Sequence, residues 1–430
     1  MKNWFYNESL LIYLWQLRKY DPKKLTTTTG DAIVIQDPGV GNSDAGPDFS
    51  NARVIIGDIT WYGMVEMHWF SSNWYLHNHQ EDGAYNNVIL HVVYEEDRIV
   101  YNGNGERIPC VELKDQIPKE MEDKFSQFHL GHWIPCQALL PNVSTLTSTM
   151  WLERLTIERL ETKANRIILQ LQETNWNWEE VCYRQLAKYF GSSINNLPFE
   201  KLAYITPHSI LLKHQEDPIA LEALLLGQAG FLHDETKDDH TAKLKREYEF
   251  LRKKFKLQAM EKFEWKFLRL RPQNFPTVRI AQLAALLHHH GTIFRKIIDC
   301  QNIKDLFALL TATPSEYWET HYQVGVPSKP IGKTLGKGEI KTLIINSIIP
   351  LVFLYGKYKK EDIYQQLALE WLYSLPPENN KILREWTKLG LPCTNSAQSQ
   401  ALLQLYLQYC SPKKCLNCGI GNAIINQRRP

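Results

Sequence analysis

The spacing of apolar residues changes once along this chain, near Leu146, and that change sets its fold class. Before this point, short apolar runs bounded by Gly, Pro and Asn are typical of β-strands. After it, apolar residues recur every three or four positions, as on the buried face of an amphipathic helix. We therefore expect an α+β protein with two domains: a mixed sheet with flanking helices in residues 1–140, and a large all-α region in residues 141–430 that ends in a cysteine cluster.

The first domain has a definite expected order of elements. The stretch "NESLLIYLWQL" has helical spacing, and "DAIVIQD", "FSNARVIIGD" and "WYGMVEMHWF" read as three strands, the last two joined as a hairpin by "GDIT". The polar stretch "SSNWYLHNHQEDGAYNN" predicts a short helix or an ordered loop before the strand "VILHVVYEED". A second hairpin is expected in "RIVYNGNGERIPCVEL", through its Asn-Gly-Asn-Gly turn.

The composition fits a globular protein without a membrane span. Hydrophobic residues make up 44% of the 430 residues, which is ample for buried cores. The N-terminus lacks a basic segment followed by an apolar run, and the apolar stretch "TLIINSIIPLVFLYG" is shorter than the roughly 20 residues of a membrane helix. We therefore expect a soluble, cytoplasmic protein with no membrane partner.

Charge is divided unevenly along the chain. Residues 1–140 contain 11 Lys and Arg against 19 Asp and Glu, whereas the remainder contains 38 against 28. An acidic front and a basic back suit a metal-binding domain attached to one that binds a polyanion. Drift between two ordinary surfaces gives the same imbalance, so the charge favours a nucleic-acid partner without requiring one.

Carboxylates and imidazoles are concentrated on the strands of the first domain. Asp48 begins one strand, and Glu66 and His68 lie near the end of the next. Because side chains alternate along a strand, Glu66 and His68 share a face. Two carboxylates at one edge of a sheet form a good magnesium or manganese site, and such a metal lowers the pKa of a bound water. The alternative is a polar surface that binds no metal.

The sequence around these carboxylates resembles the PD-(D/E)XK nuclease motif. The stretches "GPDF" and "VEMH" supply its Pro-Asp and its Glu-x-x pattern, with His68 where that family has lysine. The resemblance covers about residues 5–95. It implies a nuclease-like fold in which Asp48 and Glu66 bind the metal, His68 positions or activates water, and Glu8 on the first helix assists.

The chain as a whole also resembles an uncharacterised bacterial family, the domain of unknown function 2851. The segments "VEMH", "HNHQEDGAYNNVILHVV" and "RPQNFPTVRIAQLA" carry this resemblance. No activity comes with that family, so this second resemblance implies no function.

Further histidines follow the motif. His77, His79 and Asp82 are candidate ligands for a nitrogen-rich metal site, and on a helix His79 and Asp82 would share a face. His91 lies inside the last strand and points to the same edge if the strand register allows it. The alternative is a hydrogen-bonded polar cluster that fixes this loop against the sheet.

Cysteines near the end of the chain form a second candidate metal site. The stretch "CSPKKCLNCGIG" places Cys410, Cys415 and Cys418 close together, and Cys-x2-Cys is a common metal knuckle. Cys393 is the expected fourth ligand. The layout resembles the C-terminal iron–sulfur staple of RecB-like nucleases, although the spacing differs, and it leaves zinc and a [4Fe–4S] cluster as alternatives. Without a metal, these residues are free thiols in a tail.

The helical region contains a basic stretch with interleaved aromatic residues. Such a stretch neutralises phosphates and stacks bases when it faces a nucleic acid, and is otherwise a solvated helix surface. The expected phosphate contacts are Lys253, Lys254, Arg269, Arg271 and Arg279. The leading hypothesis is a metal-dependent nuclease-like enzyme acting on DNA or RNA. The alternative is a non-catalytic nucleic-acid- or ribosome-associated scaffold with a degenerate nuclease domain, and both leave room for a protein partner.

Overall fold

A computed structural model describes residues 8–42, 46–117, 121, 123, 125, 128, 132–234, 238–391 and 393–426. The chain forms two compact units. The first, which we call the sheet unit, comprises Met1–Trp151 and Leu405–Pro430, and the second, the helical unit, comprises Leu152–Gln404. The expected division after residue 140 therefore needs correction, because the C-terminal segment returns to the sheet unit.

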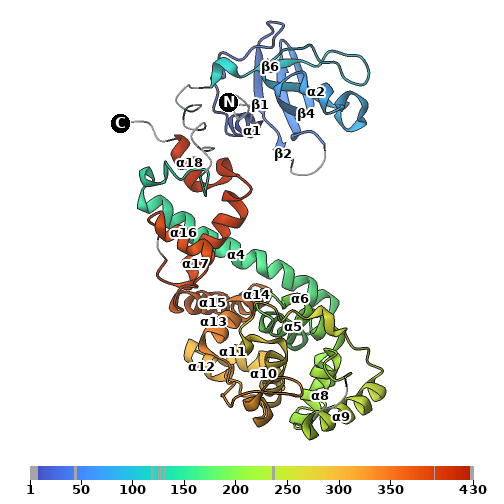
Figure 1. Cartoon of the computed structure of the whole chain (residues 1–430). Helices are drawn as coiled ribbons and strands as arrows, with labels where there is room; N and C mark the ends of the chain where they lie inside the picture. The colour runs from blue at the N-terminus through green and yellow to red at the C-terminus, as the bar shows by residue number, and fades with distance from the viewer. Residues whose placement is uncertain are drawn as a thin grey trace. The chain divides into compact units, whose positions relative to one another are not determined.

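The sheet unit is built on a mixed sheet with the strand order β1-β3-β4-β5-β6, and β2 pairs with β3 (Figure 1). Strand β3 runs antiparallel to its neighbours β1 and β4, whereas β5 runs parallel to its neighbours β4 and β6. The elements are α1 (Glu8–Gln16), β1 (Ile33–Asp37), β2 (Val40–Gly41), β3 (Phe49–Ile56), β4 (Ile59–Phe70), α2 (Asn73–Leu76), β5 (Val88–Glu95) and β6 (Cys110–Glu112). The structure contains the three expected strands between α1 and α2, with the two-residue β2 added between the first two, and then α2 and β5. This order confirms the expected mixed α/β architecture.

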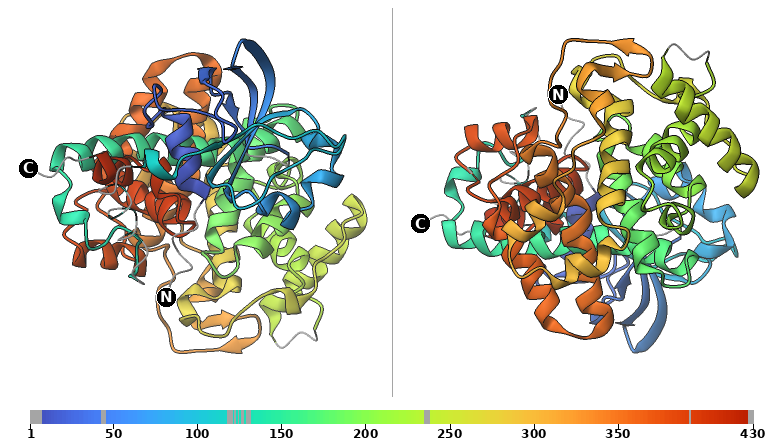
Figure 2. Two further views of the ribbon diagram at one scale, coloured as in Figure 1. Left: turned by 90° about the horizontal axis from the view of Figure 1, so that it is seen from above. Right: turned by 90° about the horizontal axis from the view of Figure 1, so that it is seen from below.

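Local sequence explains the hairpin and the buried strand. Ile56 pairs with Ile59 across the turn between β3 and β4, and Gly57 adopts a positive φ of 58° there, which glycine tolerates without strain. The apolar run of β5 is buried on both faces, as expected of a strand with parallel neighbours. Helix α1 packs against β4 and β5 through its apolar side chains (Figures 1 and 2).

The second expected hairpin is not a ladder of paired strands. A single antiparallel bridge joins Tyr101 and Arg107, and the chain then continues as β6, which pairs in parallel with β5. Two further hydrogen bonds cross this turn, from the N–H of Asn102 to the carbonyl of Glu106 and from the N–H of Ile108 to the carbonyl of Val100. Beyond the turn the chain pairs with β5, where the N–H of His91 donates to the carbonyl of Pro109.

The region after Leu146 is helical, as the apolar spacing predicts. Its helices are α4 (Thr145–Glu173), α5 (Trp178–Phe190), α6 (Asn196–Ile205), α7 (His208–Leu212), α8 (Pro218–Gln228), α9 (Asp239–Phe255), α10 (Pro276–His289), α11 (Ile293–Asp299), α12 (Ile303–Leu309), α13 (Lys337–Leu343), α14 (Ile349–Lys359), α15 (Asp362–Ser374), α16 (Lys381–Lys388) and α17 (Ser396–Gln404). A small hairpin of β7 (His321–Gln323) and β8 (Val326–Pro327), which the sequence did not predict, projects from the helical unit (Figure 2).

One helical stretch, Lys337–Lys359, is long and apolar enough to cross a membrane by length and composition. It runs through α13, a π-helical turn η8 (Ile344–Ile348) and α14. The most apolar part of it is 67% buried within the protein, and its isoleucines belong to the hydrophobic core of the helical unit. The apolar residues of this stretch are therefore those of a buried core helix.

Close packing between α8 and α9 depends on a glycine. A Cβ atom added at Gly227 would overlap the ring of Tyr248. That ring cannot easily move, because Tyr248 is buried and its hydroxyl donates to Gln228 Oε1 at 2.9 Å. We expect Gly227→Ala to lower the free energy of unfolding by about 1–3 kcal/mol, the usual cost of overpacking a core. Urea unfolding followed by circular dichroism measures this change.

The matched control is Gly338→Ala in α13, where an added Cβ would meet no atom within 4 Å. Alanine favours a helix more than glycine does, so this variant should be neutral or slightly stabilised. Equal stability of the two variants would contradict the packing argument.

Candidate metal centre

The pairing of β3 with β4 brings Asp48 and Glu66 together. Phe49 pairs with Val65 in an antiparallel register, so the preceding Asp48 lies opposite Glu66. The backbone N–H of Asp48 donates to Glu66 Oε2 at 3.1 Å, and the N–H of Met67 donates to Asp48 Oδ2 at 3.0 Å. The backbone of β4 thus holds the carboxylate of Asp48, and the backbone at the start of β3 holds the carboxylate of Glu66.

The carboxyl groups of this pair are electrostatically strained. Burial raises the pKa of Asp48 to about 6, against the lowering effect of the Met67 N–H, and the charge of Glu8 raises it further. Burial also raises the pKa of Glu66 to about 9, with the charges of Asp48 and Glu8 adding to the effect. Acidic neighbours therefore oppose the ionisation of Asp48 and Glu66, and a divalent cation is the partner that would favour it.

Histidines lie directly beside this pair. Glu66 Oε1 is 3.5 Å from His68 Nε2 and 3.3 Å from His79 Nε2. His68 Nδ1 lies 2.8 Å from His91 Nε2, and His68 Nε2 lies 3.1 Å from His77 Nδ1. One ligand atom from each of His68, His77 and His79 fits within 4.8 Å of the others. The strand alternation of Glu66 and His68 is as expected, and His91 joins them because it pairs with Glu66 across β4 and β5.

The ring of His77 is exposed, whereas burial keeps the imidazoles of His68, His79 and His91 neutral. Burial lowers the pKa of His68 to about 2, of His79 to about 4 and of His91 to about 3, with neighbouring histidines as the second cause in each case. Neutral imidazole is the form that binds metals. His79 Nε2 and His91 Nδ1 are buried without a hydrogen-bond partner, since the contact of His79 with Glu66 lacks hydrogen-bond geometry. Unpartnered buried nitrogens beside buried carboxylates are a donor set that suits a divalent cation.

Tyr85 completes the wall of the site. Its ring stacks on His79 with centroids 3.8 Å apart, and burial together with the charge of Glu66 raises its pKa to about 12. Asp82, a predicted ligand, has a different role: its carboxylate accepts the N–H of Ala84 at 2.9 Å and caps a short turn. The charge of Asp82 raises the pKa of His79 slightly against the effect of burial, but the Asp82 side chain is exposed and lies outside the histidine group.

The predicted cysteine ligands are divided between the units. Cys410, Cys415 and Cys418 are buried in the sheet unit, whereas Cys393 lies in the helical unit, half-buried before α17. A fourth buried cysteine of the sheet unit is Cys136, which the sequence analysis did not select.

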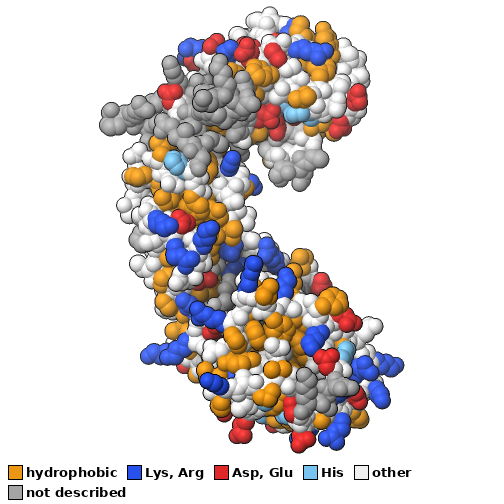
Figure 3. Space-filling model, in the orientation of Figure 1, with side chains coloured by type: hydrophobic (Ala, Val, Ile, Leu, Met, Phe, Trp, Pro, Cys, Tyr) orange, Lys and Arg blue, Asp and Glu red, His pale blue; other side chains and the backbone are white. Residues whose placement is uncertain are grey.

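The predicted phosphate contacts are also not equivalent. Lys253, Lys254, Arg269 and Arg271 are exposed. Arg279 is not: it is 7% exposed, donates to Asn274 Oδ1 and Gln282 Oε1, and pairs with Glu339 at 3.0 Å. Its guanidinium holds α10 in place, so we remove it from the candidate contacts. On the face that Figure 3 shows, Lys and Arg side chains scatter over the helical unit between acidic and apolar ones rather than forming one stripe.

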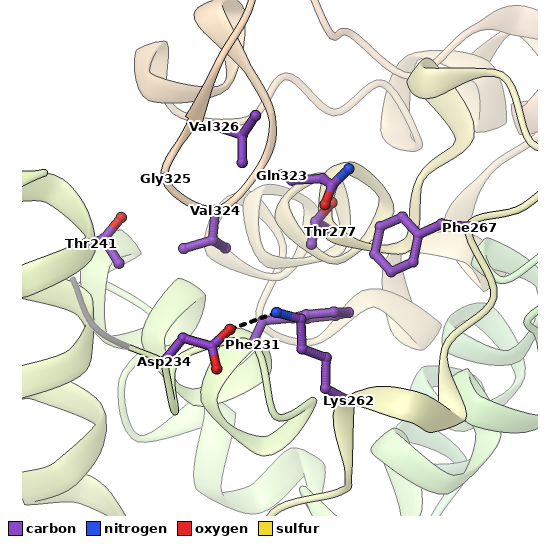
Figure 4. Close-up of a pocket in the computed structure, with 10 residues that line it drawn as sticks. All are labelled: Phe231, Asp234, Thr241, Lys262, Phe267, Thr277, Gln323, Val324, Gly325 and Val326. Carbon is purple, nitrogen blue, oxygen red and sulfur yellow. Dashed lines mark hydrogen bonds and ion pairs between the residues drawn. The ribbon is translucent and has the colours of Figure 1, made fainter. Parts of the chain in front are cut away.

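The helical unit also contains a pocket between α9, α10 and the β7–β8 hairpin (Figure 4). Thr241, Thr277 and Gln323 line it. Its described charged residues, Asp234 and Lys262, are paired with each other at 2.6 Å. A phosphate would therefore have to compete with a carboxylate for the cation, and the pocket adds nothing to the nucleic-acid hypothesis.

Comparison with known proteins assigns the chain to a family. It belongs to the DUF2851 family, described as a protein of unknown function, whose model matches residues 8–381. Neither the curated proteins nor the solved structures gave a match.

Proposed function

We propose that this member of the DUF2851 family is a metal-dependent phosphodiesterase of the PD-(D/E)XK type that acts on DNA or RNA. The observation that carries the proposal is the buried Asp48–Glu66 pair, held by reciprocal backbone hydrogen bonds with His68 on the same strand face. The strand order supports it, because three antiparallel strands followed by a short helix and a parallel strand is the arrangement that the motif resemblance implies.

Each residue has a definite role in this proposal. Asp48 and Glu66 would hold a magnesium or manganese ion, which when bound lowers the pKa of a water and stabilises charge on a phosphoryl oxygen. Glu8 adds negative charge near both carboxylates and so increases their demand for a cation. His91 holds Nδ1 of His68, and Nε2 of His68 lies 3.5 Å from Glu66 Oε1 and contacts His77. His68 would position the water through Nε2, with the water in place of His77.

The nitrogen-rich surroundings favour manganese over magnesium. Both ions take carboxylate and water ligands, but magnesium keeps to oxygen and several waters, whereas manganese, as a transition metal, also accepts an imidazole. His79 Nε2 lies 3.3 Å from Glu66 Oε1, so an ion bound to that oxygen has a nitrogen ligand within reach. We therefore propose manganese as the more effective ion.

The second candidate function is a non-catalytic nucleic-acid-binding scaffold, and His68 is the observation that favours it. A motif lysine is cationic and stabilises developing negative charge, but burial holds the pKa of His68 near 2 and its ring is therefore neutral. A protein of this kind would retain binding without cleavage.

A cleavage assay distinguishes the two. Purified full-length protein with manganese should cut single- or double-stranded DNA or RNA, and Asp48→Asn should lower the rate about 1,000-fold, because a catalytic metal contributes several kcal/mol to the barrier. The matched control is Asp58→Asn, which changes an exposed carboxylate in the turn of the same hairpin. Equal rates for the wild type and Asp48→Asn would refute catalysis at this site, and binding without any cleavage would support the scaffold.

A further inference from the structure

Three of the buried cysteines lie on successive turns at the C-terminal end of the sheet unit. Cys410 ends the π-helical turn η9 (Leu405–Cys410), Cys415 begins the 3-10 turn η10 (Cys415–Asn417), and Cys418 precedes α18 (Gly419–Asn426). The N–H of Cys418 donates to the carbonyl of Cys415 at 3.2 Å, which closes the Cys-x2-Cys turn. Gly421 packs so close to Cys415 that a Cβ there would overlap its carbonyl. The turns are therefore tightly folded around the sulfur atoms.

Cys136 comes to the same place from a distant part of the chain. Its carbonyl accepts the N–H groups of Leu139 and Leu140, which forms a turn leading into η4 (Leu140–Asn142), and η4 contacts α18. Aromatic residues on either side fix this contact. Trp133 stacks on Tyr406 with centroids 4.8 Å apart, and Trp151 lies edge-on to Tyr409 at 5.5 Å.

The four sulfur atoms form one buried group. Cys136, Cys410, Cys415 and Cys418 are each at most 8% exposed, and none of them forms a disulfide. They lie within electrostatic reach of one another: Cys418 acts on Cys136, and Cys136 acts on both Cys410 and Cys415. Burial raises the pKa of Cys136 and of Cys415 to about 12, so without a cation these two thiols stay protonated at neutral pH.

We propose that Cys136, Cys410, Cys415 and Cys418 are the four ligands of a thiolate metal centre that fastens the C-terminal segment to the sheet unit. The proposal does not depend on the proposed nuclease activity, since it rests on other residues. Cys136 replaces Cys393, which belongs to the helical unit, as the fourth ligand. One ligand, Cys136, lies far upstream of the other three, so a metal bound to all four would close a long loop of the chain. Cross-links that close long loops stabilise a fold most.

Zinc and a [4Fe–4S] cluster are the two metal groups that four thiolates commonly hold. Zinc is a single ion and leaves the protein colourless, whereas the cluster contains several iron atoms and colours the protein brown. The metal content of the protein therefore identifies the group.

The test is metal analysis of full-length protein purified without oxygen. We expect bound metal in either of two amounts: one zinc ion per chain, or about four iron atoms with four sulfides in a brown protein. Cys136→Ser should lose at least nine-tenths of this metal, and the matched control Cys393→Ser should keep it.

A measurement on the unchanged protein covers the case in which Cys136→Ser does not fold. Removing the metal from wild-type protein should raise hydrogen exchange at least tenfold in Leu405–Asn426 and leave helix α8 unchanged. Wild-type protein that contains neither iron nor zinc, or a Cys136→Ser variant that keeps its metal while Cys393→Ser loses it, would overturn the proposal.

Discussion

Replacing Glu66 by glutamine is expected to stabilise the metal-free protein at pH 8 by about 3 kcal/mol and to abolish its stabilisation by manganese. Folded Glu66 keeps its proton up to a pKa of about 9, whereas the same carboxyl in the unfolded chain ionises near 4.5. The unfolded state is therefore increasingly favoured as the pH rises between these values. At 1.36 kcal/mol per pKa unit the cost at pH 8 reaches about 5 kcal/mol at most.

The sign of this effect makes it diagnostic. Glutamine keeps an oxygen to accept the Asp48 N–H but has no proton to lose, so wild type and Glu66→Gln should be equally stable near pH 4 and diverge towards pH 9. Manganese at 100 times its Kd should add about 2.7 kcal/mol to the wild type alone. Urea unfolding across this pH range measures the stability difference between the two proteins and the stabilisation by manganese. The matched control is Glu81→Gln, an exposed carboxylate of the same unit. A destabilised Glu66→Gln variant would show that this carboxylate is structural.

The affinity for manganese should rise about 1,000-fold between pH 6 and pH 9. A metal binds the ionised carboxylate, so it must displace the proton that Glu66 holds below its pKa of about 9. Each pH unit then adds about a factor of ten to the affinity. Below pH 6 the slope should steepen, because Asp48, with a pKa of about 6, also begins to hold a proton.

Isothermal titration calorimetry in buffers of different ionisation enthalpy measures the number of protons released when manganese binds. We expect about one proton per ion at pH 8. The buried histidines release none, since burial keeps them neutral throughout this range. An affinity that levels off above pH 7 would instead indicate an ordinary exposed histidine as the ligand that titrates.

The sequence predicted the candidate site where local rules determine geometry. The turn "GDIT" sets the β3–β4 register at its own end of the hairpin, where Ala52 pairs with Gly63. That register alone would set Asp48 opposite Met67, but a bulge between Phe49 and Ala52 shifts the pairing by one residue and brings Asp48 opposite Glu66. Alternation along β4 then puts His68 on the face of Glu66. Of the candidates after the motif, His77 and His79 do lie in the histidine group, whereas Asp82 caps a short turn. Helical spacing could not place these residues, because the segment is a short helix followed by two 3-10 turns.

What could not be predicted depends on contacts between distant segments. Cys136 lies in an unremarkable stretch, and its place beside Cys418 follows from how the C-terminal segment returns to the sheet unit. Arg279 reads as one more cation in a basic run, yet the packing of α10 against α13 buries it beside Glu339. A single sequence contains no signal for either pairing.

The central claim is that Asp48 and Glu66 together hold a divalent cation. Anomalous diffraction at the manganese edge, from crystals of the full chain soaked in manganese at pH 8, tests it most directly. We predict one strong peak about 2.0–2.6 Å from an oxygen of each carboxylate, and its loss in Glu66→Gln. A structure with no peak there, or with manganese bound only to His77 and His79, would contradict the claim.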